Sequence, residues 1–99
     1  MLVRMFGFRV RKGRERATES FMLRKAMGVL KRIGGCRQAY FLRSREKKGE
    51  YMWVTVWASE AALKKAMGRK DWQALVKEET AEFFVGKAKV RHYGVAARK

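Results

Sequence analysis

The sequence predicts an α+β fold of the ferredoxin-like type, in which a βαββαβ chain forms one antiparallel sheet with helices on one face. Strand-like and helix-like hydrophobic patterns follow one another in the order strand, helix, strand, strand, helix, strand, which is the split βαβ plan. Of the 99 residues, 47% are hydrophobic and 12% are aromatic, which is ample for one packed core and little more. We therefore expect residues 1–99 to form a single domain.

The first strand and helix are predicted over residues 2–33. Residues Leu2–Val10 alternate, with Phe6, Phe8 and Val10 on one face and Val3, Met5 and Gly7 on the other. A strand that is apolar on both faces is expected to be central in the sheet and covered on both sides. After a basic turn at 11–14, helical spacing runs from Glu15 to Ile33 through Phe21, Met22, Leu23, Ala26, Met27 and Leu30. Gly34 and Gly35 predict a left-handed cap at the end of this helix.

A β-hairpin is predicted next. Its strands are Cys36–Arg43 and Tyr51–Trp57, and the second is the clearest strand of the chain, since it is β-branched and aromatic throughout. The polar stretch Ser44–Gly49 connects them, with Gly49 expected at the left-handed position of the turn.

The second half contains two short helices and a closing strand. Ser59 is expected to cap a helix from Glu60 to about Gly68, and Asp71 to cap another. In the latter, the apolar side is predicted to carry Trp72, Leu75, Val76 and Ala81, and the solvated face Glu78, Glu79 and Glu82. The closing strand, Val85–Val95, alternates between a face with Gly86, Ala88, Val90, His92 and Gly94 and a face with Lys87, Lys89, Arg91 and Tyr93.

The strands carry more apolar surface than helices on one face of a sheet can bury. Leaving Trp53 and Trp57, or alternatively Met52, Val54 and Val56, in water would forfeit roughly 1.5–3 kcal/mol per side chain. An apolar patch of this size is typical of an interface, and two sheets packed face to face through an isologous contact would bury it. We therefore expect a homodimer.

Charge and cysteine content limit the remaining possibilities. The formal charge is +16, from 25 basic and 9 acidic residues, and such a protein attracts polyanions, including nucleic acid. A chain rich in ions and without Asn also fits a heat-adapted source, so the charge alone does not assign a partner. The single Cys36 excludes an internal disulfide and a cysteine metal site, and no apolar run is long enough for a membrane span. We expect a cytoplasmic protein with no metal and no membrane partner.

Three stretches resemble a known family. The segment Gly49–Leu63 reads as a strand, a tryptophan, one residue, a serine and an alanine-rich helix, which is similar to the signature of antibiotic biosynthesis monooxygenase (ABM) domains. The similarity extends to Lys70-Asp71-Trp72 and to the closing strand Val90–Val95. The resemblance implies a dimeric α+β barrel. It also implies a cofactor-free oxygenase acting on aromatic polyketides or quinols, a haem-degrading enzyme, or a member without known activity.

The residues of the known branches are incomplete here. The haem-degrading branch uses an Asn, a Trp and a His, and the matching positions carry Phe6, Ala66 and Val76. We therefore do not expect haem degradation. The polyketide-oxidising branch places Asn, Trp, Tyr and Arg in its pocket, and this chain has no Asn. What the resemblance favours is oxidation of an aromatic or quinol-type molecule with no cofactor.

Candidate site residues follow from this interpretation. The protein would deprotonate the substrate, and the anion would react with oxygen directly. Arg4, which shares a strand face with the phenylalanines, and His92, the one histidine, are the candidate catalytic residues that could stabilise the anion. The expected pocket residues are Phe6, Phe8, Phe21, Trp57 and Trp72.

Two other functions remain open at this point. The same element order builds the RNA recognition motif, and Lys48–Val54 is loosely similar to the third-strand signature of that module, in which aromatic residues stack on bases. With Tyr40 and the face carrying Lys87, Lys89, Arg91 and Tyr93, this predicts a single-stranded nucleic-acid-binding protein. The other alternative is a dimer that binds a small aromatic ligand without turning it over.

Overall fold

The computed structural model describes residues 1–99 and has the predicted element order. The strands are β1 (Leu2–Val10), β2 (Cys36–Arg43), β3 (Glu50–Trp57) and β4 (Phe84–Gly94). The helices are α1 (Glu15–Phe21), α2 (Met27–Lys31), α3 (Glu60–Met67) and α4 (Lys70–Glu82), and one π-helical segment, η1 (Met22–Ala26), joins α1 to α2. The sheet order is β2-β3-β1-β4, and every neighbouring pair is antiparallel. The predicted ferredoxin-like α+β fold is confirmed.

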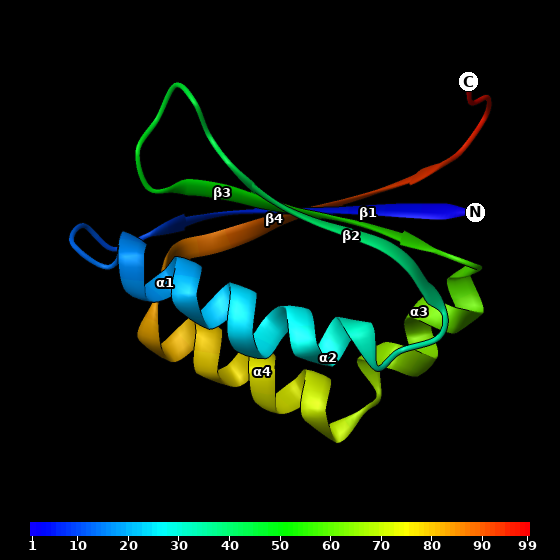
Figure 1. Cartoon of the computed structure of the whole chain (residues 1–99), viewed down its shortest axis with the longest axis horizontal. Helices are drawn as coiled ribbons and strands as arrows, with labels where there is room; N and C mark the ends of the chain where they lie inside the picture. Colours follow the sequence, from blue (N-terminus) through cyan, green and yellow to red (C-terminus); the bar gives the residue numbers. More distant parts are fainter.

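All helices lie against one face of the sheet, and the other face is open (Figure 1). The β1–β3 register pairs Phe6 with Trp53 and Phe8 with Tyr51, so these aromatic side chains point to the same side. Phe8, Tyr51 and Trp53 are buried with the inner faces of the helices in a hydrophobic core of 16 residues, against which the partly buried Phe6 packs. Trp57 and Met22 in this core are wholly inaccessible. The structure thus places Trp53 and Trp57 on the helix side and Met52, Val54 and Val56 on the open side.

The first helix departs from its prediction in its middle. The π-helical segment interrupts the α-helical spacing, and Leu23, expected on the buried stripe, is 62% exposed. Because consecutive helical residues are about 100° apart, Phe21, Met22 and Leu23 cannot all face a single apolar stripe. Phe21 and Met22 are buried, and Leu23 points outward.

Glycines at two of the predicted turns behave differently. Gly49 has a φ of 87° and takes the left-handed position of the β2–β3 turn, as predicted. The predicted left-handed cap at Gly34 and Gly35 is wrong, because neither residue has a positive φ and the helix ends at Arg32 in a right-handed turn. Gly35 is needed for a close approach instead, since a Cβ there would lie 2.7 Å from the Cβ of Ala62 in α3.

The two helices of the second half start at different kinds of residue. The Ser59 hydroxyl accepts a hydrogen bond from the Ala62 N–H at 3.1 Å, as expected of the α3 cap. Asp71 was expected to cap the next helix, but α4 begins at Lys70 and Asp71 lies within its first turn. Its carboxylate accepts hydrogen bonds from the Arg69 guanidinium and from the Trp72 backbone N–H.

The last strand, β4, is irregular near its start. A bulge with Gly86 at a φ of 69° shifts the β1–β4 register, and beyond it Lys89, Arg91 and Tyr93 lie on the open face. No helix of this chain combines the length and the apolar character needed to cross a membrane.

Candidate active site

A small cavity lies between the sheet and the helices. Its volume is about 40 Å³. Most of its wall is hydrocarbon, and it is lined from β1 and β3 by Arg4, Phe6, Trp53 and Thr55, and from the helical layer by Ala26, Leu30, Trp72, Leu75, Val76 and Glu79. The sheet therefore supplies one wall and the helical layer the other. Arg4 and Glu79 are the two ionisable groups that reach this apolar space.

Arg4 extends from β1 onto the helix side of the sheet. Its guanidinium carbon lies 4.9 Å from the centre of the Phe6 ring and 5.5 Å from that of Trp72. The Nε atom is buried and has no hydrogen-bond partner. Burial lowers the pKa of Arg4, and the negative charge of Glu79 acts in the opposite direction. A cation held against two aromatic rings with a free N–H donor is suited to an anionic ligand.

Glu79 comes from α4 on the opposite wall and is only 5% exposed. Neither of its carboxyl oxygens takes part in a hydrogen bond within the protein, and no arginine or lysine nitrogen lies within 4.0 Å of them. Burial raises the pKa of Glu79 from 4.5 to about 7, although the charge of Arg4 partly offsets this effect. The cavity therefore contains an unpaired carboxyl group that titrates near neutral pH.

The prediction that Glu79 lies on a solvated face is wrong. Trp72, Val76 and Glu79 are spaced by four and then three residues, which places them on one stripe of α4. This spacing was the signal available in the sequence, but it was missed because Glu79 was grouped with Glu78 and Glu82. Of these three glutamates only Glu79 is buried, whereas Glu78 binds the Lys25 ammonium at 3.1 Å on the surface.

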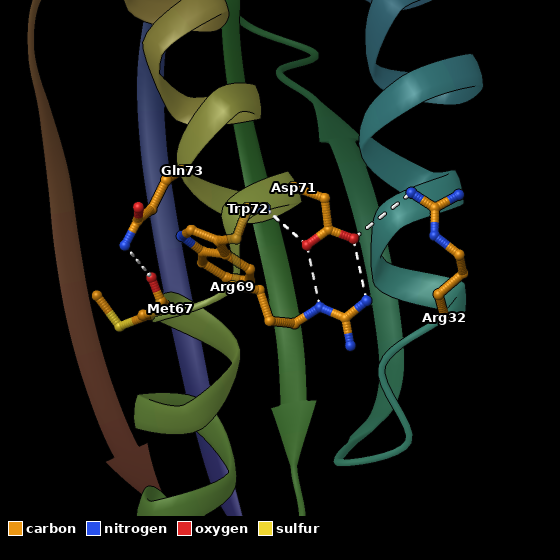
Figure 2. A network of polar contacts seen from close by, with 6 residues as sticks. All are labelled: Arg32, Met67, Arg69, Asp71, Trp72 and Gln73. Atoms are coloured by element: carbon orange, nitrogen blue, oxygen red, sulfur yellow. Dashed lines mark hydrogen bonds and ion pairs between the residues drawn. The ribbon is translucent and has the colours of Figure 1, made fainter.

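Trp72 forms one side of the cavity and is held at its backbone by an ionic network (Figure 2). The Trp72 ring packs edge-on against the Trp57 ring, with 5.8 Å between the ring centres. The backbone N–H of Trp72 donates to Asp71 Oδ1 at 2.9 Å. Asp71 also accepts two hydrogen bonds from Arg69, both at 3.0 Å, and lies 3.6 Å from Arg32 Nη2 beyond the end of α2. The hydrogen bonds from Arg69 are the main reason that the pKa of Asp71 falls to about 2. The network therefore links the start of α4 to the end of α2.

A second, open hollow of about 530 Å³ lies on the outer side of α4. Trp72 and Val76 line both this hollow and the inner cavity, so these two side chains stand between them. The rest of its wall is Met67, Gln73, Lys77, Thr80 and Ala81, and Gln73 Nε2 donates to the Met67 carbonyl at 3.4 Å (Figure 2).

The structure brings together some of the predicted site residues and separates others. Arg4, Phe6 and Trp72 all line the cavity. His92 is directly opposite Arg4 in the β1–β4 register, but it is exposed and does not line the cavity. The remaining three lie in the hydrophobic core outside the cavity wall: Phe8, Phe21 and Trp57. Of these, Trp57 acts on the site indirectly, because its indole N–H donates to the Thr55 hydroxyl at 2.8 Å.

The aromatic residues of β3 are not available for base stacking. Tyr51, Trp53 and Trp57 point toward the helices and are buried. Of the residues suggested for nucleic-acid binding, Tyr40 and Tyr93 are about half exposed on the open face, but they belong to the two outermost strands, β2 and β4. The prediction that aromatic residues of the third strand form an exposed stacking surface is therefore wrong.

Comparison with known proteins identifies the relatives of this chain. The sequence model of the antibiotic biosynthesis monooxygenase family matches residues 1–78. Among solved structures, SnoaB, a cofactor-independent oxygenase from Streptomyces nogalater, is similar with a TM-score of 0.84 and 20% identity, over 98% of this chain and 94% of that one. A provisional antibiotic biosynthesis monooxygenase from Deinococcus radiodurans has a TM-score of 0.86 and 9% identity, over 100% and 96% of the two chains. No curated protein matches the sequence. At these identities the structural similarity establishes the fold alone.

Proposed function

Because the chain belongs to the antibiotic biosynthesis monooxygenase family, we propose that it is a cofactor-independent oxygenase that acts on an electron-rich aromatic, quinol-type small molecule. The similarity to SnoaB, which is a cofactor-independent oxygenase, supports this activity. The observation that carries the proposal is the unpartnered guanidinium of Arg4 within an apolar, aromatic-walled cavity. A reaction that proceeds through a substrate anion needs a cation of this kind at the site where negative charge develops.

The chemistry requires only the substrate and dioxygen. Loss of a proton leaves an electron pair on the aromatic substrate, and the resulting anion is electron-rich enough to reduce O2. One oxygen atom forms a bond to the substrate carbon and the other leaves as water, so that a CH2 group plus O2 gives a C=O group plus H2O. In this scheme Arg4 stabilises the anion, and the hydrocarbon wall excludes water from it.

The cavity must enlarge to admit an aromatic ring. A dry cavity that binds benzene measures about 150 Å³, whereas this one is about 40 Å³. Trp72 and Val76 are the side chains whose movement would connect the cavity to the outer hollow. We therefore propose that a ligand enters past these two residues and that the structure represents the closed form.

Haem degradation is not proposed. Two of the positions that matter in that branch of the family, Phe6 and Val76, line this cavity with hydrocarbon alone, and the third, Ala66, is buried in α3 outside it. None of the three can coordinate or orient a porphyrin by hydrogen bonds.

We also propose that the protein is a cytoplasmic homodimer joined through the open face of its sheet. Val3, Met5, Val54 and Val56 point to that face, away from the helices, and Tyr40, Leu42 and Tyr93 are exposed around them. A second copy packed face to face would bury this apolar surface through an isologous contact. The free thiol of Cys36 fits a reducing compartment.

Oxygen consumption tests the activity. Purified protein is incubated with a panel of hydroquinones, anthrones and flavonols in an oxygen electrode, and products are analysed by mass spectrometry after reaction under isotopically labelled dioxygen. We expect incorporation of one labelled atom. Arg4→Gln should lower kcat/KM by roughly 10²–10³, the usual cost of losing one oxyanion donor. Arg9→Gln is the matched control, because Arg9 is an exposed arginine on the same strand and outside the cavity.

The same experiment separates the alternatives. Tight binding of one of these compounds without oxygen uptake would replace the oxygenase proposal with a ligand-binding dimer. Retention of a single-stranded oligonucleotide at moderate salt, with no response to any aromatic compound, would favour nucleic-acid binding instead.

A further inference from the structure

We propose that Glu79 is the catalytic base of this site, and that its carboxylate accepts the proton which the substrate loses beside Arg4. This assignment rests on the proposed function, since it names the partner that the substrate anion requires for its formation. From α4 the sequence analysis named Trp72 as a pocket residue but no catalytic residue. The assignment is carried by the position of Glu79, by its lack of partners and by the composition of the remaining wall.

The wall offers no other proton acceptor. Apart from Arg4, which is a cation and cannot accept a proton, the side chains around Glu79 are hydrocarbon, indole or, at Thr55, a hydroxyl that already accepts the Trp57 N–H. The helix wall contributes Ala26 and Leu30, and β3 contributes Trp53, none of which titrates. From β4, His92 lies beside Arg4 but is exposed and outside the cavity. Glu79 is therefore the one group in place to take the proton.

Two other partly buried carboxylates of this protein, Glu19 and Asp71, are paired. Glu19 accepts the Tyr51 hydroxyl at 2.7 Å and an Arg43 N–H at 3.0 Å, and Asp71 is bound by Arg69. A structural role for a buried carboxyl group normally includes such partners, because an unpaired one costs free energy. Glu79 is more buried than either of these residues and has none. An uncompensated group of this kind is typical of a functional site.

Proton transfer between substrate and Glu79 leaves the charge of the cavity unchanged. Before transfer the negative charge is on the Glu79 carboxylate, and after it the charge is on the substrate oxygen or carbon, with Arg4 positive throughout. The substrate O–H or C–H bond breaks, its electron pair stays on the substrate, and the proton is bound by a carboxyl oxygen. The proton can then be returned to the reduced oxygen atom that leaves as water. No new charge has to be created in the apolar cavity, which keeps the barrier low.

The acidity of the group suits this exchange. Burial raises the pKa of Glu79 to about 7, and Arg4 is the one charged group that opposes the rise. A base is most effective when its pKa lies near the working pH, because a useful fraction is ionised and the proton is held firmly enough to move. At neutral pH about half of the molecules would have the carboxylate ready.

The test compares Glu79→Gln with its neighbour Glu78→Gln. Both substitutions remove one carboxylate from α4 without changing shape, but Glu78 is on the surface with Lys25. We expect Glu79→Gln to lower kcat by roughly 10²–10⁴ with little change in KM, and to abolish a rise of kcat/KM with pH whose midpoint lies near 7. Glu78→Gln should retain both the rate and the profile. Glu79→Asp, which keeps a carboxylate, should restore part of the rate, and circular dichroism verifies that each variant is folded.

A measurement without oxygen separates this inference from the proposed function. Bound para-nitrophenol is followed by its absorption band under anaerobic conditions, because its neutral and ionised forms differ in colour. Because Arg4 favours the phenolate in both proteins, proton uptake on binding is recorded with a pH indicator at pH 8, where the free phenol and Glu79 are both largely ionised. The wild type should take up about one proton as Glu79 becomes protonated beside the bound phenolate, and Glu79→Gln should take up none. If the wild type takes up this proton but never consumes oxygen, the base assignment stands and the oxygenase proposal falls. If Glu79→Gln keeps the wild-type rate and pH profile, the assignment of Glu79 is overturned and the oxygenase proposal stands.

Discussion

Glu79→Gln should also change how the stability of this protein depends on pH. Glu79 has a pKa of about 7 in the folded protein, against an ordinary value of 4.5 in an unfolded chain. Between these values the folded state holds a proton that the unfolded state releases, so stability falls as the pH rises. The favourable contribution is complete below pH 4.5 and is lost as the pH passes through about 7. Since one pKa unit corresponds to ~1.4 kcal/mol, the loss amounts to about 3 kcal/mol.

Urea unfolding at several pH values between 4.5 and 8.5 measures this effect. The free energy of unfolding of the wild type should decline by about 3 kcal/mol relative to that of Glu79→Gln, which has no titrating group at this position. Glu78→Gln is the control, and its curve should stay within about 0.5 kcal/mol of the wild type, because Glu78 is exposed. Parallel curves for the wild type and Glu79→Gln would refute the reasoning, since they would mean that the Glu79 carboxyl is hydrated in solution.

Three further predictions concern the core, a close contact and the open face. Trp57→Ala removes a side chain that is 0% exposed and should cost about 3–5 kcal/mol in urea unfolding, with loss of the fold preceding any selective loss of ligand binding; a cost below about 1 kcal/mol would contradict this. Gly35→Ala should cost about 1–3 kcal/mol because the new Cβ meets Ala62, and adding Ala62→Gly should recover part of it; independent, additive effects would show that the contact is absent. Val54→Lys should convert a dimer of about twice 11.6 kDa into a folded monomer in light scattering, and a wild type that is itself monomeric would exclude the proposed interface.

Most of the fold could be predicted because its strands and helices carry strong local patterns. The alternation of Tyr51–Trp57 and the helical spacing after Glu15 follow from the need to bury apolar side chains on one face of each element. The Ser59 cap and the left-handed Gly49 were equally local, since each depends on a few neighbouring residues. The resemblance to antibiotic biosynthesis monooxygenase domains used the same local patterns, and the family match over residues 1–78 confirms it.

The predictions that were wrong depended on which groups surround a residue in the folded chain. Gly34 and Gly35 looked like a helix cap, but Gly35 is required by the approach of α3, which is distant in sequence. Leu23 was expected on the buried stripe of the first helix, yet the helix turns Phe21 and Met22 toward the core and leaves Leu23 exposed. Asp71 looked like a cap, but Arg69 and Arg32 both bind its carboxylate within the first turn of α4.

Of the two ionisable residues in the candidate site, only Arg4 was predicted from the sequence. Arg4 drew attention because a cation among Phe6 and Phe8 on one strand face is unusual, and the structure places it in the cavity. Glu79 gave no such signal, because a glutamate next to Glu78 in a helix is normally solvated. Its environment is created by β1, β3 and the first helical segment together.

The sequence by itself determined the order of the elements and the family, because local hydrophobic periodicity and capping chemistry set these features. Only the tertiary structure decided which sheet face the helices cover, and that Arg4 and Glu79 share one cavity while His92 stays outside it. The physical reason is that a side chain's burial and acidity depend on groups brought near it by strand register and helix packing. Those distances arise only when the whole chain is folded.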